Sequence, residues 1–139
     1  MAVHGGLLRM DTQGDGQILD ITDGVMSIVR TSGVERGLVT VFATGSTVAV
    51  TTMEYEPGGV SDLQALLEKL IPQRGAFYEH NRLNQDTNAH AHLRAAVIGP
   101  SETIPVVGGE LVLGTWQQVV LVDFDDRPRS RTVTVQVLS

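Results

Sequence analysis

The chain has 139 residues, of which 42% are hydrophobic, and this is the size and composition of one globular domain spanning residues 1–139. It has no cysteine, which excludes disulfides, thiolate metal sites and cysteine nucleophiles. The formal net charge of −6 argues against nucleic-acid binding, which needs a positive field. We find no signal peptide and no apolar run near the roughly 20 residues of a membrane helix, and we expect a cytoplasmic protein without membrane partners.

The first half of the chain alternates between strand and helix patterns. Residues 17–21 predict a strand, and Thr22 is expected to cap the helix that follows, because its hydroxyl can accept from a free backbone N–H. Gly33 suits the left-handed position that ends such a helix. Residues 38–44 and 46–54 predict two strands, since both are rich in β-branched residues and the second alternates with period two. Gly45 between them allows either a tight connection or a bulge.

A second helix is predicted by an apolar stripe at helical spacing. Its members are Leu63, Leu66, Leu67, Leu70 and Ile71. Ser61 and Gln64 form a capping-box pattern at its start, and Pro72 ends it.

Residues 73–92 are polar, and a connection this long in a small domain is usually functional or disordered. The segment 88–99 then predicts a helix, with Asn88 as its cap.

The last third of the chain predicts antiparallel strands. Residues 103–107 and 110–114 flank a glycine pair typical of a hairpin, residues 119–124 predict a central strand, and residues 132–138 alternate again. Residues 125–131 are expected to join the last two strands as a short hairpin. This order is not strict βαβ alternation, and it predicts an α+β fold in which a largely antiparallel sheet is layered with two to three helices.

Three of the four histidines, His80, His90 and His92, fall within thirteen residues. Three histidines with an open fourth position are typical of a catalytic zinc site, and nearby oxygen ligands such as Asn88 could contribute. Acid–base catalysis or phosphate contact is the favoured alternative, and solvated histidines at a helix start are the third. Glu54, on the same face of its predicted strand as three small or apolar residues, would need an arginine or a metal as partner if it points inward.

Two short segments could bind an anion. Residues 44–47 form a small, hydroxyl-rich turn whose backbone N–H groups can wrap an oxyanion. Arg127, Arg129 and Arg131 alternate and would share one face of a strand, where they could gather a diphosphate. The alternative is pairing with the neighbouring aspartates, which we favour for Arg127. Trp116, the only tryptophan, is expected in a core or interface, with stacking on a ring substrate as the alternative.

Several of these motifs together resemble the YjbQ family, known as secondary thiamine-phosphate synthases. The resemblance runs from about residue 15 to the C-terminus and is carried by Gly45-Ser46-Thr47, Glu54, His80, Asn88-Ala89-His90-Ala91-His92-Leu93, Ile104-Pro105-Val106, Gly114-Thr115-Trp116-Gln117 and residues 127–131. It implies an α+β homotrimer with pockets near the subunit interfaces. It also implies a weak activity that joins a hydroxymethylpyrimidine diphosphate to a thiazole phosphate and releases diphosphate.

The resemblance also assigns roles. His92, His80 and Glu54 become the catalytic candidates, and a divalent metal, Mg²⁺ or Zn²⁺, would be held by the histidines. Substrate contacts would come from Ser46, Thr47, Asn88, Arg94, Trp116, Arg129 and Arg131. Many members carry His-Thr-Thr where this chain has Gly45-Ser46-Thr47, which removes one ligand or base here. The alternative function is non-catalytic binding of a metal or a small phosphorylated metabolite.

Overall fold

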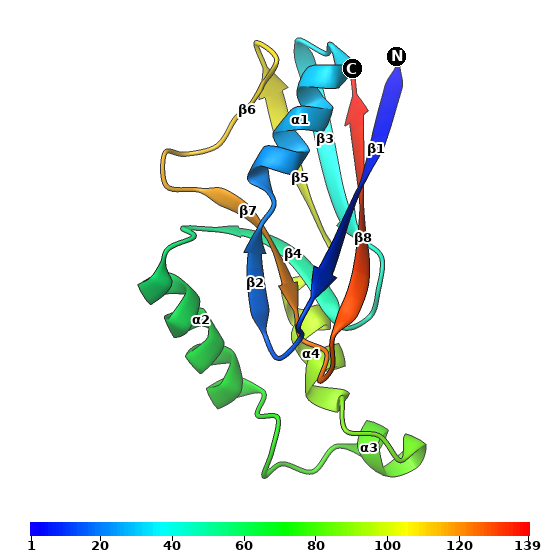
Figure 1. Cartoon of the computed structure of the whole chain (residues 1–139), viewed down its shortest axis with the longest axis vertical. Helices are drawn as coiled ribbons and strands as arrows, with labels where there is room; N and C mark the ends of the chain where they lie inside the picture. Colours follow the sequence, from blue (N-terminus) through cyan, green and yellow to red (C-terminus); the bar gives the residue numbers. More distant parts are fainter.

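The computed structural model describes all residues, Met1–Ser139, and contains eight strands and four helices (Figure 1). The strands are β1 (Val3–Thr12), β2 (Gln17–Asp20), β3 (Arg36–Ala43), β4 (Val48–Met53), β5 (Ser101–Val107), β6 (Glu110–Leu111), β7 (Gln118–Asp123) and β8 (Arg129–Leu138). The helices are α1 (Thr22–Ser32), α2 (Pro57–Leu70), α3 (Glu79–Asn84) and α4 (Ala89–Ile98). None of these helices has the length and apolar character needed to cross a membrane.

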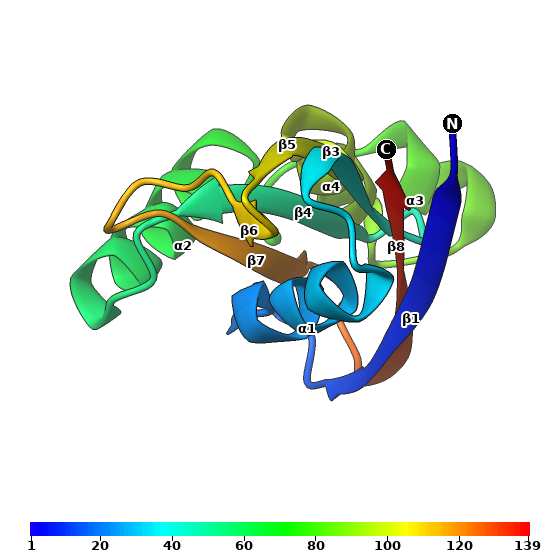
Figure 2. The same ribbon diagram turned by 90° about the horizontal axis from the view of Figure 1, so that it is seen from above.

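The strands form two sheets in which every pairing is antiparallel. One has the order β1-β8-β3-β5-β6 and the other the order β2-β7-β4. The five-stranded sheet curves around α1, which lies on its concave side next to β7 (Figure 2). The predicted α+β class with a largely antiparallel sheet is confirmed.

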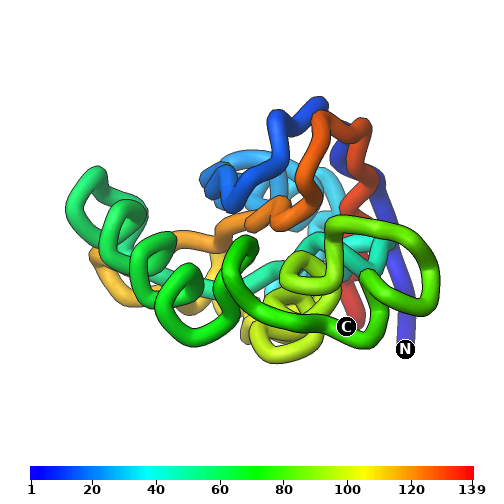
Figure 3. Tube along the Cα trace, turned by 90° about the horizontal axis from the view of Figure 1, so that it is seen from below, coloured from blue at the N-terminus to red at the C-terminus, as the bar shows by residue number.

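Two clusters of buried side chains hold these layers together. The larger lies between the sheets and α1 and includes Val25, Val39 and Leu121. The smaller covers the opposite face of the three-stranded sheet, where Val120 packs with Leu67 of α2 and with small side chains of α4. Figure 3 shows α2 and α4 on the side of the molecule opposite α1. Strand β7 is therefore buried on both faces, which explains its unbroken apolar sequence.

The predicted hairpin between the last two strands is wrong. Strand β7 pairs with β2 and β4, whereas β8 pairs with β1 and β3, so the connection crosses from one sheet to the other. The backbone N–H of Phe124 donates to the carbonyl of Thr47, and that of Asp15 donates to the carbonyl of Asp125, at 2.9 and 2.7 Å. These bonds replace the ladder that a hairpin would have supplied, and they fix the connection beside the β3–β4 turn.

Strand β1 and helix α3 were not predicted. The burial of β1 alternates only from Gly6 onward, and its pairing with β8 joins segments more than a hundred residues apart, which leaves no local signal. Helix α3 is a short helix with no buried residue, so it lacks the apolar stripe by which helices are recognised.

Of the three predicted N-caps, Asn88 does occupy the N-cap position of α4, whereas the other two are wrong. Thr22 is the first helical residue of α1, and the carboxylate of Asp20 accepts from its N–H at 3.0 Å. Helix α2 starts at Pro57 because the carboxylate of Glu56 accepts from the two following glycine amides. The predicted left-handed Gly33 is confirmed, with φ of 70°.

The apolar stripe of α2 is only partly buried, because Leu67 is 4% exposed whereas Leu70 is 65% exposed. We expect Leu67→Ala to lower the free energy of unfolding by about 2–5 kcal/mol, since it leaves a cavity against Val120. The matched variant Leu70→Ala should change it by less than about 1 kcal/mol. Urea denaturation of both variants measures the difference, and equal losses would contradict this packing.

Candidate functional site

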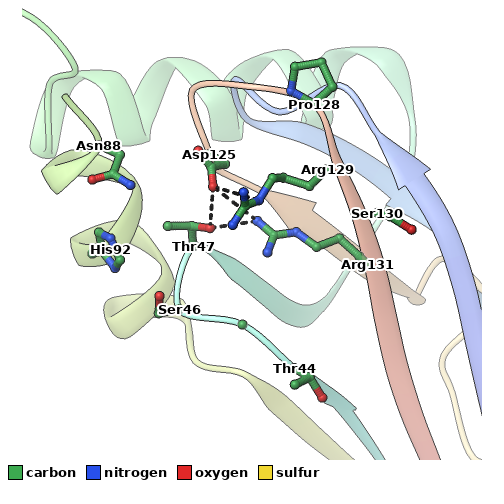
Figure 4. A pocket seen from close by; sticks show the side chains of 11 residues that line it. Thr44, Ser46, Thr47, Asn88, His92, Asp125, Pro128, Arg129, Ser130 and Arg131 are labelled. Atoms are coloured by element: carbon green, nitrogen blue, oxygen red, sulfur yellow. Dashed lines mark hydrogen bonds and ion pairs between the residues drawn. The ribbon is translucent and has the colours of Figure 1, made fainter. Parts of the chain in front are cut away.

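A cavity of about 540 Å³ lies where three segments that are distant in the sequence meet. Its walls are the turn of residues 44–47 between β3 and β4, the first turn of α4, and the segment around Asp125 and residues 128–131 that enters β8 (Figure 4). No hydrophobic side chain lines it. Such a lining is suited to a charged or strongly hydrogen-bonding ligand.

Arg131 is the most constrained side chain of this cavity. It is buried, and its Nε and Nη2 donate to the two carboxylate oxygens of Asp123 at 2.6 and 2.8 Å. Its Nη2 also donates to the hydroxyl of Thr47 at 2.7 Å. This two-point contact fixes the guanidinium plane and joins the end of β7 to the start of β8.

Asp123 remains ionised inside the protein. Its burial alone would raise the pKa of this carboxyl, but hydrogen bonds from Arg131 and Thr12 favour the charged form and hold the pKa below its ordinary value of 3.8. Asp123 thus provides a permanent negative charge that holds Arg131 in place.

Arg129 lies beside this pair and uses only part of its guanidinium within the chain. Its Nε lies 3.2 Å from Oδ2 of Asp125, which also accepts from the hydroxyl of Thr47 at 3.0 Å. Two arginines thus face two aspartates, and Figure 4 shows Asp125, Arg129 and Arg131 gathered around Thr47. Both Nη groups of Arg129 and Nη1 of Arg131 remain without a partner in the chain, and these donors are left for a ligand.

The β3–β4 turn adds backbone donors. It is anchored at both ends, because the N–H of Thr44 donates to the carbonyl of Thr132 and the carbonyl of Thr47 accepts from Phe124. The backbone N–H groups of Gly45, Ser46 and Thr47 make no hydrogen bond within the chain. Successive free amides of this kind form anion-binding concavities.

Helix α4 supplies the opposite wall. Asn88 precedes its first residue, and its buried Oδ1 has no hydrogen-bond partner. His92 lies on the cavity side of the helix, and its ring centroid is 4.7 Å from that of His80 in α3. The N-terminal end of a helix dipole favours negative charge, so this wall also suits an anion.

His90 does not join the other two histidines. Residues two positions apart in a helix point in nearly opposite directions, and His90 is buried, with its Nδ1 unpartnered. Its burial, helped by the positive charge of Arg94, lowers the pKa of this imidazole. No group of three His, Asp or Glu side chains gathers in a metal-binding arrangement, so the three-histidine site is not formed within one chain.

Two other predicted site residues also lie outside the cavity. Glu54 is exposed and follows the end of β4 that leads to α2, whereas the cavity lies at the beginning of β4. The inward orientation expected for it is wrong, because the strand ends at Met53. Trp116 is 72% exposed in the β6–β7 connection, so the core reading is wrong and it remains available to a partner.

Two arginines also behave differently from expectation. Arg94 is buried and donates to Glu68 at 2.6 Å and to the carbonyl of Ile71 at 2.7 Å, so it attaches α4 to the end of α2. Its hydrogen bond lowers the pKa of Glu68. Arg127 was expected to pair with an aspartate, but it is exposed and makes no ion pair, whereas Arg129 and Arg131 form those pairs.

The structure therefore brings together six of the predicted residues: Ser46, Thr47, Asn88, His92, Arg129 and Arg131. The two carboxylates that organise them, Asp123 and Asp125, were considered only as competitors for the arginines. The sequence signal for this pairing is the spacing of two residues between the aspartates, which matches the spacing of Arg129 and Arg131 on the other side of the connection.

These features define a class of α+β domain in which two antiparallel sheets meet at an arginine- and hydroxyl-lined cavity. The family model "UPF0047 protein YjbQ-like" matches residues 7–139, and the chain belongs to this family. A UPF0047 protein of Archaeoglobus fulgidus is 41% identical over 94% of this chain and 98% of its own length. One of Methanothermobacter thermautotrophicus is 37% identical over 99% and 93%.

Solved structures show the same fold. A protein of Aeropyrum pernix superposes with a TM-score of 0.89 at 38% identity, covering 97% of this chain and 98% of its own. A YbjQ-like protein of Sulfolobus solfataricus gives a TM-score of 0.88 at 32% identity and covers 99% of both chains.

We expect Asp123→Asn to lower the free energy of unfolding by about 3–5 kcal/mol, because it leaves Arg131 buried without its counter-charge. The pKa of Asp123 is lower in the folded than in the unfolded state, so the unfolded chain binds more protons in acid. This stabilisation is complete above the ordinary pKa of 3.8 and is lost as the pH falls through the folded-state pKa. Urea titrations between pH 7 and 3 should show a shallower acid loss in the variant.

The matched control is Glu110→Gln, which breaks the ion pair between Arg30 and Glu110, both more than half exposed. Its effect should stay below about 1 kcal/mol, as for exposed ion pairs in general. Similar losses in the two variants would show that the Asp123–Arg131 pair does not organise the site.

Proposed function

We propose that the cavity binds the phosphate groups of a small organic diphosphate and that the protein is a transferase. In this reaction hydroxymethylpyrimidine diphosphate condenses with thiazole phosphate and diphosphate is released. The observation that carries the proposal is the convergence of free guanidinium N–H groups of Arg129 and Arg131 with three free backbone amides on one cavity. The resemblance to secondary thiamine-phosphate synthases supplies the reaction.

The chemistry requires stabilisation of a leaving group more than activation of a nucleophile. The bond between the pyrimidine methylene carbon and the diphosphate oxygen breaks with its electron pair on oxygen, and the ring nitrogen of the thiazole forms the new carbon–nitrogen bond. Fixed donors stabilise the charge that develops on the diphosphate. Arg131 is held in place by Asp123 before any ligand binds, so little reorganisation is needed. His92 faces the cavity and is suited to donate a proton to a phosphate oxygen, and its contact with His80 positions the ring.

We expect purified protein with both precursors and Mg²⁺ to form thiamine phosphate slowly. Arg129→Gln should lower the rate about 10²-fold or more, as does the loss of one donor to a developing oxyanion. His92→Asn should also lower it about 10²-fold, as for loss of a general acid. Arg127→Gln is the matched control, since Arg127 belongs to the same segment but is exposed and does not line the cavity. Product is measured by chromatography, and equal rates in all four proteins would contradict the assignment.

A second candidate function is binding of a small phosphorylated metabolite without turnover. It is favoured by the placement of Glu54 outside the cavity, which leaves His92 as the only titratable lining group besides the paired Asp125 and the arginines. Binding of both precursors without product formation would favour this function. No group of three His, Asp or Glu side chains gathers within one chain, and the divalent metal stays a prediction.

The homotrimer implied by the resemblance is also part of the proposal. The outer face of the five-stranded sheet carries Leu7, Leu38, Phe42 and Val107, all exposed. On β3 these alternate with the buried Val39 and Val41, so they lie on the face turned away from α1 and the core. Exposed apolar side chains on one face of a sheet are typical of an interface.

Phe42→Asp should convert the trimer to a smaller species, because it places a charge in this surface. A second variant, Thr103→Asp, places a charge on the neighbouring strand β5 of the same face and tests the same expectation. Sedimentation equilibrium measures the mass. A monomer mass for the unmodified protein at micromolar concentration would overturn the trimer, and a trimer in both variants would place the interface elsewhere.

A further inference from the structure

A second hollow, of about 410 Å³, lies outside the cavity and shares no lining residue with it. Its volume is within the range of about 300–1,000 Å³ that small-molecule sites have. Its walls come from α3 and from the α2–α3, α3–α4 and β7–β8 connections, and no hydrophobic side chain belongs to them. The lining residues are Gln73, Arg74, Asn81, Thr87 and Asp126, and we call this site the polar hollow.

Arg74 brings a positive charge that has no partner in the chain. It is exposed, and its guanidinium makes neither an ion pair nor a hydrogen bond with another residue. The backbone around it is nevertheless fixed, because the hydroxyl of Tyr78 donates to the carbonyl of Pro72 at 2.6 Å and closes the loop that carries Arg74. The N–H of Gln73 donates to the carboxylate of Glu68 at 3.2 Å, which ties the same loop to α2. Arg74 is therefore a cation with five N–H donors on an anchored loop.

Asp126 brings a negative charge that has no cationic partner either. The carboxylate is half-buried, and its Oδ2 accepts from the hydroxyl of Thr87. Its backbone N–H donates to Oδ1 of Asp125 at 2.8 Å, which fixes its position at the start of the connection. The charge of Asp126 acts on the buried imidazole of His90, but burial lowers the pKa of that group, so His90 is neutral near pH 7 and offers no counter-charge. A partly buried carboxylate of this kind gains from a cation that reaches it.

The two charges line one hollow without meeting. Arg74 and Asp126 form no ion pair with each other, so a space separates them. The side-chain amide of Gln73 makes no hydrogen bond within the chain, and Asn81 uses its Oδ1 to accept from the N–H of Ala89 at 3.0 Å while its Nδ2 stays free. A ligand with one charge only would satisfy one side of the hollow and leave the opposite charge unpaired. A ligand with both charges satisfies both sides.

We infer that the polar hollow is a second ligand site and that it takes a small zwitterion, a molecule with one carboxylate and one ammonium group, such as a free amino acid. Arg74 would hold the carboxylate in a two-point contact, and Asp126 would accept from the ammonium group. The site does not depend on the proposed function, because it shares no residue with the cavity and involves no reaction.

The test is nuclear magnetic resonance titration of the full ¹⁵N-labelled chain with glycine, β-alanine and γ-aminobutyrate, in which the two charges are progressively farther apart. Acetate and methylamine, which carry one charge each, are titrated alongside. At least one of the zwitterions should shift the amide signals of the polar hollow and bind about tenfold more tightly than acetate or methylamine, since a hydrogen bond to a charged group contributes about this factor. Arg74→Gln and Asp126→Asn should each reduce its affinity to that of the singly charged probes.

The matched control is Arg127→Gln, because Arg127 follows Asp126 directly, is exposed and does not line the polar hollow. It should keep the affinity of the unmodified chain. Acetate binding as tightly as every zwitterion, with a loss only in Arg74→Gln, would show a simple anion site and overturn the inference. The absence of shifts with all three zwitterions, or an equal loss of affinity in the control, would overturn it as well. None of these outcomes bears on the phosphate cavity.

Discussion

The buried contact between Arg131 and Asp123 is the interaction on which the rest of this site depends. Asp123 ends β7 and Arg131 lies near the start of β8, so one ion pair joins the two sheets at the point where the chain crosses between them. Thr47 completes the contact from the β3–β4 turn. Because removing water from two charges is costly, such a pair is retained where its geometry is good and its remaining donors are satisfied. Here it positions three segments, and Asp125, in contact with Arg129 and Thr47, links the same segments a second time.

This arrangement decides what the cavity can recognise. The arginines are balanced by Asp123 and Asp125, so the attraction for an anion comes less from net charge than from donors with fixed directions. Fixed donors discriminate by geometry, and a tetrahedral group with several oxygens, such as a phosphate, satisfies several of them together. An acidic protein can therefore bind a phosphorylated ligand without a basic surface, as the net charge of −6 requires.

The sequence predicted those parts of the fold that have a local signal. The apolar run of β7, the alternation of β8 and the left-handed Gly33 all depend on neighbours within a few residues, and each was predicted correctly. The crossing between sheets and the strand β1 depend on contacts over more than a hundred residues, which no local pattern contains. The same distinction applies to the site. The hydroxyl-rich turn and the alternating arginines were recognisable, whereas the outward position of Glu54 follows from where β4 ends, and the separation of His90 from His92 follows from the helix period.

The pairing of β1 with β8 has a consequence for synthesis. Residues 3–12 form their ladder only with residues 129–138, so β1 stays unpaired until β8 has been synthesised. A nascent chain emerging from the ribosome exposes β1 without a partner until residues 129–138 have been made, since domains of this size fold as units. Contacts of such long sequence separation also slow folding, because the loop must close before they are formed. The cavity, which includes Arg129 and Arg131 from β8, therefore forms only after these residues have been made, and a chain truncated before β8 lacks it.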